Sequence, residues 1–464
     1  MVSRTYIKDL HSHVGKEVTV AGWISGRRDH GKLIFLDLRD ETGLVQTVAK
    51  PTHETAHHIA DTLRQEWVIK GKAMVNKRPE KMVNAEQDNG DIELEFTALE
   101  VLNSAETPLF DLGTPGYEVS EETRLKYRYL DLRRARLQKN MRMRDKVIQY
   151  MRAFLGQRGF VEIETPILTK STPEGARDYI VPSRLDQGKF YALPQSPQQY
   201  KQLLMASGFE RYFQVARVFR DEDMRGDRQA EFTQLDIEMA FPTQEEILNL
   251  TEELYTSIVQ ELYPKKRMQQ TPWPRMSYEE AMKKYGTDRP DIRENKEDPD
   301  LLAFVWVLDF PLFEPTLENG HFAPSHHMFT APKEEDLGKL DTDPGSVRSY
   351  QHDMVLNGYE VGGGSIRIHN SDLQQKIFKL IGFDERQQKE FAHMLEAFRR
   401  GVPPHGGIAP GIDRFIMVLQ NEPNIREVIA FPKTGEGRDL MMSAPSDVAQ
   451  KQLDELGISI KKKK

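Results

Sequence analysis

Residues 208–238 (GFERYFQVARVFRDEDMRGDRQAEFTQLDIE) combine residue types that can bind a nucleotide and a nucleic acid at one place. Two runs rich in aromatic and β-branched residues flank an almost wholly charged loop, which predicts a β-hairpin. A fixed arginine such as Arg220 suits an α-phosphate, and the aromatic face of Phe232 suits a purine ring. Arg225 and Arg228 on the loop suit a nucleic-acid end. The pattern predicts a site that joins ATP to RNA, and the alternative is an exposed hairpin with solvated charges.

Two further carboxylates stand seven residues apart in HDMVLNGYE, at Asp353 and Glu360. Magnesium takes only one or two protein carboxylates when phosphate and water complete its octahedron. As a bare pair, two acids at this spacing are more often surface residues. Glu360, however, comes just before the glycine run 362–364, which allows the backbone to approach a ligand closely.

The first part of the chain must fold separately from these residues. Residues 1 to about 103 alternate short β-type runs with Gly, Asn and Asp turns, and a polar, helix-compatible stretch at 52–64 follows the third run. Five strands with a helix in that place is the order of an OB-fold barrel, which often binds single-stranded nucleic acid. The aromatic and polar residues of these strands could equally be ordinary barrel filling.

Residues 104–120 contain two prolines, two glycines and little periodicity, so we interpret them as a hinge. From residue 121 onward we expect a second domain in which helices dominate. Apolar residues recur there at helical spacing and predict either core packing or a dimer interface. They are Val147, Ile148, Met151, Phe154 and Leu155.

Composition limits the possible classes of protein. The net charge of −8 argues against indiscriminate nucleic-acid binding, because such proteins usually carry a basic excess. Basic residues gather locally at 124–146, either as a solvated helix face or as a track for an RNA backbone. No cysteine is present, which excludes disulfides and thiolate metal sites. With no long apolar run and no secretory leader, we expect a cytoplasmic location.

The motifs in family order resemble the class II aminoacyl-tRNA synthetases, in the form of the bacterial-type aspartyl enzymes. FRDED and RQAEFTQLDIE are similar to motif 2. Residues 154–168 (FLGQRGFVEIETPIL) resemble motif 1, a long helix and a strand ending at Pro166, and residues 406–419 (GGIAPGIDRFIMVL) resemble motif 3. TPEGARDY, LPQSPQQYKQLL, NGYEVGGGSIRIH and VIAFPKT match as well, so the resemblance covers nearly the whole chain.

This resemblance implies an α+β multidomain fold: an OB-fold anticodon-binding domain at 1–103 and a class II catalytic domain at 121–464, with an antiparallel sheet flanked by helices. It also implies an aspartate–tRNA ligase with ATP as a substrate, Mg²⁺, L-aspartate and tRNA(Asp), working as a homodimer in the cytoplasm. Arg220, Glu360 and Arg414 would be catalytic, with Phe232 and Arg414 sandwiching the adenine and Glu222 near it. Asp353 and Glu360 would hold the metal ion. The full ATP set is Arg220, Asp221, Glu222, Gln229, Phe232, Glu360, Gly411, Ile412, Asp413 and Arg414.

For the amino acid, the resemblance implies that Arg367 and Lys201 bind the side-chain carboxylate, with Asp236 behind them to orient the cations. Glu174 and Gln198 would meet the α-ammonium, and residues 171–178 would be a mobile loop. The full aspartate set is Glu174, Gln198, Lys201, Arg220, Asp236, His326, His327 and Arg367. An asparagine amide offers neither the charge nor the second anionic oxygen, so this set favours aspartate.

In the barrel, the resemblance places the anticodon contacts at Arg28, His30, Phe35, Gln46 and Glu93. A histidine at position 30 resembles enzymes that also charge tRNA(Asn), whereas leucine is common in strictly tRNA(Asp) enzymes; both alternatives stay open.

One departure concerns the large insert domain of bacterial aspartyl enzymes. The chain passes from Arg293 through ENKEDPDLLA into FVWVLDFPLFE, so we expect no such domain. Competing functions are an asparaginyl or lysyl enzyme, an ammonia-dependent asparagine synthetase and a tRNA-binding paralogue with an inactive site.

Overall fold

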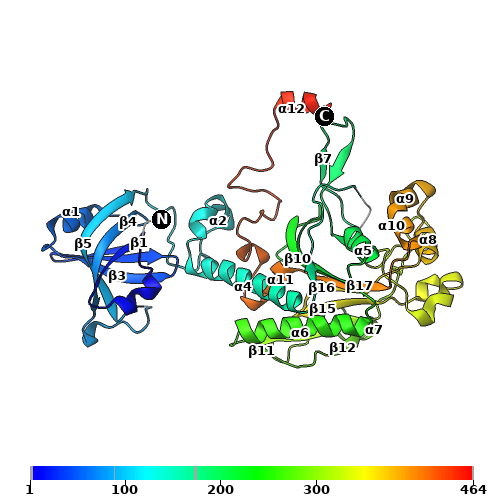
Figure 1. Cartoon of the computed structure of the whole chain (residues 1–464), viewed down its shortest axis with the longest axis horizontal. Coiled ribbons are helices and arrows are strands. Elements are labelled where there is room, and N and C mark those ends of the chain that lie inside the picture. The colour runs from blue at the N-terminus through cyan, green and yellow to red at the C-terminus, as the bar shows by residue number, and fades with distance from the viewer. Residues whose placement is uncertain (1–3, 88, 172–174, 462–464) are drawn as a thin grey trace. The chain divides into compact units, whose positions relative to one another are not determined.

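The computed structural model describes residues 4–87, 89–171 and 175–461 (Figure 1). The chain divides into two compact units, residues 1–120 with 129–135 and residues 121–128 with 136–464. Residues 104–120, all of them described, contain no helix or strand. Among the helices of the described ranges, none has the length and apolar character needed to cross a membrane.

The first unit contains a closed barrel of five strands in the order β1-β2-β3-β5-β4. Alternate residues of each strand point inwards, as Leu36 and Leu38 do on the second strand, and together they form the barrel core. Helix α1 (Glu54–Thr62) follows the third strand, so the predicted OB-fold order is confirmed. The strands are β1 (Glu17–His30), β2 (Leu33–Asp40), β3 (Gly43–Ala49), β4 (Val68–Lys77) and β5 (Ile92–Asn103), with short 3₁₀ turns η1 (Ile7–His13) and η2 (Glu80–Met82) beside them.

The second unit is built on an eight-stranded sheet in the order β12-β14-β15-β16-β17-β10-β9-β6. The six central strands are antiparallel, as expected, but each edge strand runs parallel to its neighbour. The sheet is therefore mixed, because its two short edge strands enter after crossover segments. The strands are β6 (Val161–Glu162), β9 (Arg211–Phe219), β10 (Glu231–Ala240), β12 (Arg275–Ser277), β14 (Phe304–Leu308), β15 (Gln351–Leu356), β16 (Tyr359–Ile366) and β17 (His405–Pro410).

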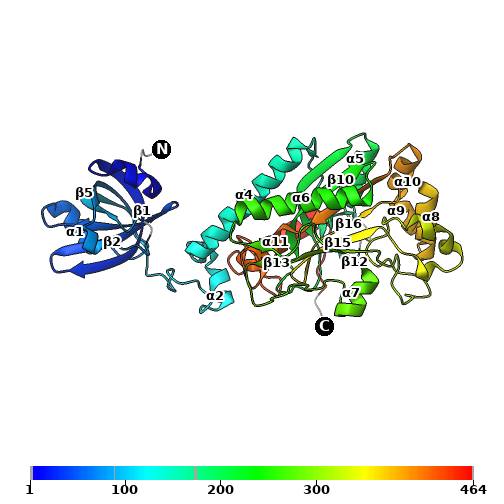
Figure 2. The ribbon, with the colours of Figure 1, turned by 90° about the horizontal axis from the view of Figure 1, so that it is seen from below.

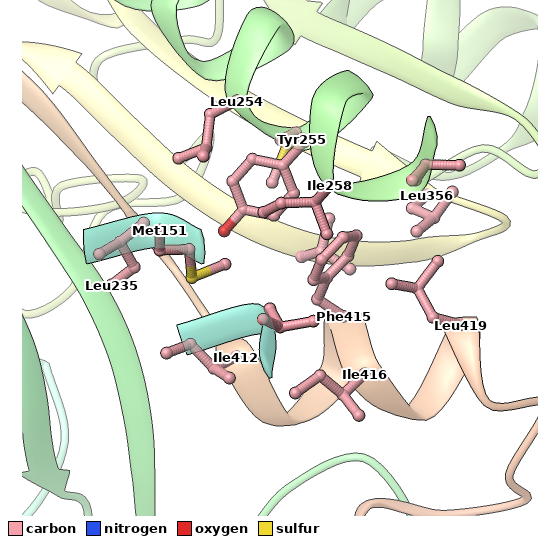
Figure 3. Close-up of a cluster of buried hydrophobic side chains, with 14 of the residues drawn as sticks. Met151, Leu235, Leu254, Tyr255, Ile258, Leu356, Ile412, Phe415, Ile416 and Leu419 are labelled. Atoms are coloured by element: carbon pink, nitrogen blue, oxygen red, sulfur yellow. The ribbon is translucent and has the colours of Figure 1, made fainter. Parts of the chain in front are cut away.

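The main hydrophobic core lies between this sheet and α4 (Ala135–Gln157), α6 (Gln244–Leu262) and α11 (Ile412–Leu419). Helix α6, which runs along the sheet in Figure 2, begins at a capping box in which Thr243 and Glu246 satisfy each other's backbone N–H groups. Figure 3 shows Met151 of α4, Tyr255 of α6 and Phe415 of α11 meeting in the core. The apolar stripe of α4 lies in this core, so the packing interpretation of that stripe is confirmed.

The other elements connect or cover these layers. They are α2 (Glu121–Lys126), α3 (Arg128–Asp131), β7 (Ile180–Pro182), β8 (Phe190–Ala192), α5 (Gln198–Ala206), β11 (Arg267–Met268), α7 (Tyr278–Tyr285), β13 (Leu301–Leu302), η3 (Glu334–Asp341), η4 (Pro344–Ser346), α8 (Ser371–Leu380), α9 (Glu385–Glu390), α10 (Ala392–Arg399), η5 (Ile425–Glu427) and α12 (Gln450–Leu456). The segment after Arg293 reaches β13 at Leu301 directly, which leaves no room for another domain.

Two local expectations need correction. The motif 1 strand ends at Glu162 rather than at Pro166, because β6 pairs with β9 only at Val161 and Glu162. The basic stretch 124–146 is not solvated throughout, because three of its arginines have acidic partners inside the second unit, whereas Lys139, Arg142 and Lys146 are exposed. These ion pairs are Arg124–Glu427, Arg136–Glu422, Arg136–Glu427 and Arg144–Asp413.

Candidate active site

A cavity of about 400 Å³ opens on the sheet face opposite the hydrophobic core. The alternation of β10 explains its position: Leu235 and Ile237 enter the core, whereas Gln234 and Asp236 line the cavity. Most of the residues predicted for the site meet here, although they come from distant parts of the chain. The predicted residues that line it are Gln198, Lys201, Arg220, Glu222, Gln229, Phe232, Asp236, His326, His327, Glu360, Arg367, Gly411, Asp413 and Arg414.

Three predicted residues are placed differently, and a fourth, Glu174, is not described. Ile412 is buried in the hydrophobic core (Figure 3) and does not line the cavity. Asp221 is paired with Arg177, outside the cavity lining. Asp353 lies just behind the lining, and Glu174 falls outside the described residues.

One end of the cavity is closed by a buried cluster of two cations and two acids. The Lys201 ammonium lies 2.7 Å from Asp236 Oδ1 and 3.2 Å from Glu238 Oε2. Arg367 Nε donates to Glu238 Oε1 at 3.2 Å. All four side chains are at most 2% exposed, so each charge depends on the others for compensation. One N–H group of the ammonium donates to Asp236, and Glu238 adds a second ion pair.

The two acids differ in electrostatics. Burial raises the pKa of Glu238, but the charges of Arg367 and Lys201 outweigh this effect and hold that pKa below its usual value. For Asp236 burial dominates and raises the pKa, even though Lys201 acts against it. Glu238 is therefore the firmer anion. The sequence analysis missed Glu238, although its position two residues after Asp236 on the same strand face could have indicated it.

Arg367 is fixed from a second side as well. Its Nη1 donates to His327 Nε2 and to Ser365 Oγ, each at 2.7 Å. Burial, followed by the charge of Arg367, lowers the pKa of His327 well below its ordinary value. His327 is therefore a neutral acceptor that orients the guanidinium and adds no charge.

Several buried polar atoms around the cavity have no hydrogen-bond partner in the described structure. An unsatisfied buried polar atom costs about 1–3 kcal/mol, so a set of them facing one cavity indicates a polar ligand. They are Gln198 Nε2, Gln229 Nε2, Gln234 Oε1, Asp236 Oδ2 and Gln351 Oε1.

The other end of the cavity carries two flat or cationic groups suited to a nucleotide. The Arg220 guanidinium lies 5.3 Å from the centre of the Phe232 ring. Arg414 is held by three acceptors: the Asp227 carbonyl at 3.0 Å, the Glu360 carbonyl at 2.8 Å and the Asp227 carboxylate at 3.2 Å. Asp227, which no sequence pattern indicated, thus fixes the plane of the Arg414 guanidinium.

Asp413 lines the cavity but has structural partners. Its carboxylate pairs with Arg144 of α4, and its Oδ2 accepts from the backbone N–H of Thr233 at 3.0 Å. Asp413 therefore ties the start of α11 to β10 and α4.

Asp353 and Glu360 converge on Gly363. A Cβ atom at Gly363 would lie 3.1 Å from Asp353 Oδ1 and 3.6 Å from Glu360 Oε1, so both carboxylates border the same small space. Burial and the negative charge of Asp353 raise the pKa of Glu360, which a cation would reverse. The described residues contain no group of three or more metal-ligating side chains. Two carboxylates fit Mg²⁺ only if phosphates and water complete the shell.

His326 lies beside the same acids, with Nε2 3.4 Å from Asp353 Oδ2. Burial lowers its pKa, but Asp353 and, more weakly, Glu360 outweigh burial, so the pKa of His326 is raised.

The predicted anticodon residues share the outer face of the barrel. Arg28 of β1 stands opposite Phe35 of β2, and Gln46 Nε2 donates to Glu93 Oε2 at 3.3 Å. His30 is exposed at the end of β1. These side chains are brought together by strand pairing, as expected for a face that meets a nucleic acid.

Comparison with known families agrees with both units. Residues 120–435 match the family described as tRNA synthetases class II (D, K and N), and residues 18–102 match the OB-fold nucleic acid binding domain family.

The chain is 44% identical to the aspartate–tRNA(Asp/Asn) ligase of Rubrobacter xylanophilus, over 97% of this chain and 95% of that protein. It is 41% identical to the aspartate–tRNA(Asp/Asn) ligase of Bacillus subtilis over 100% of both chains, and 41% identical to the aspartate–tRNA ligase of Lysinibacillus sphaericus over 99% of both. These alignments are 573 to 591 positions long, whereas the chain has 464 residues. The relatives therefore contain segments with no counterpart here.

Among solved structures, the fold is similar to asparaginyl-tRNA synthetase from Pyrococcus horikoshii complexed with asparaginyl-adenylate. The TM-score is 0.75 at 23% identity, over 94% of this chain and 99% of that one. Aspartyl tRNA synthetase from Entamoeba histolytica gives a TM-score of 0.73 at 24% identity, over 93% and 91%.

Proposed function

Because the chain belongs to the class II tRNA synthetases (D, K and N), we infer that it is an aspartate–tRNA ligase. It joins L-aspartate to ATP, giving aspartyl-adenylate and pyrophosphate, and then transfers the aspartyl group to the 3′ end of tRNA(Asp). Three relatives of 41–44% identity, aligned over nearly their full length, have this activity in their names.

The buried cluster around Lys201 and Arg367 is the observation that carries the choice of amino acid. A side-chain carboxylate entering this end of the cavity meets two oriented cations in a desolvated site. Asparagine brings neither the charge nor a second anionic oxygen, and lysine brings a further cation beside the two already present. Aspartate is therefore the substrate that this cluster favours.

Adenylation needs positioning more than acid–base chemistry. An oxygen of the α-carboxylate of aspartate attacks the α-phosphorus of ATP in line, and the P–O bond between the α-phosphorus and the pyrophosphate leaving group breaks. We assign Arg220 to the α-phosphate, where its fixed charge stabilises the negative charge that develops. Phe232 and Arg414 hold the adenine ring between them.

We assign Asp353 and Glu360 to Mg²⁺, because both carboxylates border the space at Gly363. When bound, the ion neutralises phosphate charge. ATP itself is a substrate and not a resident cofactor.

For the RNA, we assign residues 1–103 to anticodon binding, residues 104–120 to a hinge and residues 121–464 to catalysis. Phe35 suits stacking on a splayed base, and Gln46 and Glu93 offer hydrogen bonds to base edges. We also propose tRNA(Asn) as a second substrate. His30 supports this choice, and two of the relatives carry tRNA(Asp/Asn) in their names.

We propose a cytoplasmic location, because the substrates of the proposed reaction meet there. We also propose that the enzyme is a homodimer. Near Pro166, the apolar side chains of Val161, Ile167 and Leu168 are 41–52% exposed within one chain, and a twofold partner would cover them. Sedimentation at 53.6 kDa with full activity would reject the dimer.

One alternative function is that of an ammonia-dependent asparagine synthetase, which shares the catalytic core. Such an enzyme has no use for an anticodon barrel, whereas this chain has one. An asparaginyl-tRNA synthetase is disfavoured by the two cations of the amino-acid end.

The direct test is ATP–pyrophosphate exchange without tRNA, using aspartate, asparagine or lysine, followed by charging of tRNA(Asp) and tRNA(Asn) with radiolabelled aspartate. We expect exchange with aspartate and Mg²⁺ only, and charging of both tRNAs. Exchange that responds to asparagine or lysine but not to aspartate would overturn the assignment.

A further inference from the structure

A β-bulge decides which residues of β1 face outwards on the barrel. Ile24 pairs with Leu38 and points into the core, and the register then shifts so that Gly26 pairs with Asp37 and Arg28 with Phe35. The single extra residue reverses the alternation of the strand. As a result, Arg28 lies outside beside Phe35, on the same face as Asp37.

Asp37 binds Arg28 through two parallel hydrogen bonds. Arg28 Nη1 donates to Oδ2 at 2.7 Å and Nη2 donates to Oδ1 at 2.9 Å. The arginine side chain is 57% exposed, but the aspartate is only 14% exposed. The carboxylate therefore lies beneath the guanidinium and supports it, while the guanidinium faces solvent.

Gly26 leaves the space that this arrangement needs. A Cβ atom at position 26 would lie 2.9 Å from Asp37 Oδ2, so any larger residue there would push against the carboxylate. On its other side, Asp37 pairs in register with Gln46, whose amide meets Glu93. Asp37 thus stands in the middle of the proposed anticodon face, between Arg28 and Gln46.

We propose that Asp37 is a positioning residue for anticodon recognition: it holds the Arg28 guanidinium in one plane beside Phe35, with Gly26 as the residue that makes this possible. The inference rests on the proposed function, in which the barrel binds the anticodon.

Two physical arguments favour positioning over fold stability. The charged head of Arg28 is largely exposed to solvent, and ion pairs with such a solvated partner contribute little to folding, so stability is a weak reason for the pair. A free arginine loses several rotamers when it binds RNA, and a bidentate partner removes much of that entropic cost in advance.

The sign of the effect separates positioning from simple electrostatics. Removing an acid from a nucleic-acid face raises the local positive charge and, by charge alone, strengthens RNA binding. If Asp37 acts by orienting Arg28, its removal must instead weaken recognition of the cognate anticodon.

The test is a double-mutant cycle on Asp37→Ala and Arg28→Ala. The measured quantities are kcat/KM for a tRNA(Asp) transcript at fixed ionic strength, kcat/KM for a transcript with a changed anticodon, and ATP–pyrophosphate exchange. Asp37→Ala should lower kcat/KM for the cognate transcript on the order of tenfold, about the loss of one hydrogen bond to a charged group. In the Arg28→Ala background it should add less than about twofold.

Three further variants sharpen the cycle. Gly26→Ala should reproduce the Asp37→Ala loss, and Asp37→Glu should restore part of the activity. Glu100→Ala, an exposed acid at the other end of β5 from Glu93, is the matched control and should change nothing. ATP–pyrophosphate exchange, which needs no tRNA and is assigned to the second unit, should be unchanged in all variants. If Asp37→Ala fails to fold, Asp37→Asn takes its place.

The outcomes distinguish the two proposals. If Arg28→Ala leaves tRNA charging unchanged, the anticodon face assigned under the proposed function is wrong. Suppose that Arg28→Ala lowers charging. The positioning role of Asp37 alone is then overturned if Asp37→Ala has no effect or strengthens tRNA binding. It is also overturned if the double variant loses kcat/KM by the product of the two single losses, because the two residues then act independently.

Discussion

Replacing Arg367 by leucine tests the amino-acid end of the cavity most directly. The change removes the guanidinium but keeps an apolar side chain of moderate size at a position that is 2% exposed. Within the described residues, Glu238 then keeps Lys201 as its ion-pair partner, and in the proposed binding mode the aspartate side chain loses its arginine.

The magnitude follows from the bonds that are lost. A hydrogen bond to a charged group is worth about 1.5–3 kcal/mol, and an arginine clamp on a carboxylate makes two of them. A loss of about 3 kcal/mol corresponds to at least about a 100-fold fall in kcat/KM for aspartate. Because the proposed nucleotide site is at the other end of the cavity, KM for ATP should change little.

The assay is ATP–pyrophosphate exchange with aspartate and ATP varied separately. Arg367→Lys is the matched variant, because it keeps the charge but cannot reproduce the planar two-bond geometry. It should retain a thermal midpoint closer to wild type than Arg367→Leu while still losing aspartate kcat/KM. Near-normal aspartate kinetics in Arg367→Leu would show that this residue is not the side-chain clamp.

Three other predictions concern separate parts of the molecule. Asp227→Asn should raise KM for ATP several-fold and leave KM for aspartate unchanged in exchange assays, because Arg414 loses its ionic partner; equal changes in both would refute the positioning of Arg414. Burial raises the pKa of Glu427, but Arg124 and Arg136 outweigh it and bring that pKa to about 2. Since the folded pKa is depressed, the stabilisation by the Glu427 carboxylate is present above about pH 4.5 and is lost as pH falls towards 2. Glu427→Gln should therefore lower the free energy of unfolding, measured with urea, by about 3 kcal/mol at pH 7 and by progressively less in acid. A difference that does not depend on pH would contradict this prediction. His30→Leu should lower charging of tRNA(Asn) relative to tRNA(Asp) on the order of tenfold, with exchange unchanged; an unchanged ratio would make His30 an ordinary loop residue.

Sequence patterns predicted the parts of the site that depend on residue type and on local periodicity. The hairpin that carries Arg220 and Phe232 was recognisable from its aromatic and β-branched runs. The barrel order was recognisable from five β-type runs and the helical stretch after the third. In both cases the information lies within a few neighbouring residues.

The partners of these residues could not be predicted in the same way. Glu238 meets Lys201 and Arg367, which are far from it along the chain, and Asp227 meets Arg414 only because the charged loop folds over the start of α11. The basic stretch 124–146 gives a similar example. Its sequence suggested a surface position for Arg124, but this residue forms a buried ion pair with Glu427.

By itself, the sequence determined the chemistry available to this protein: an arginine for a phosphate, cations for a carboxylate, and a barrel able to present aromatic and polar groups. Tertiary structure decided which of those groups are desolvated together and which way they face. Strand register is the physical reason. One bulge before Gly26 turns Arg28 towards the outside of the barrel, and strict alternation along β10 places Glu238 beside Lys201, on the sheet face opposite the hydrophobic core.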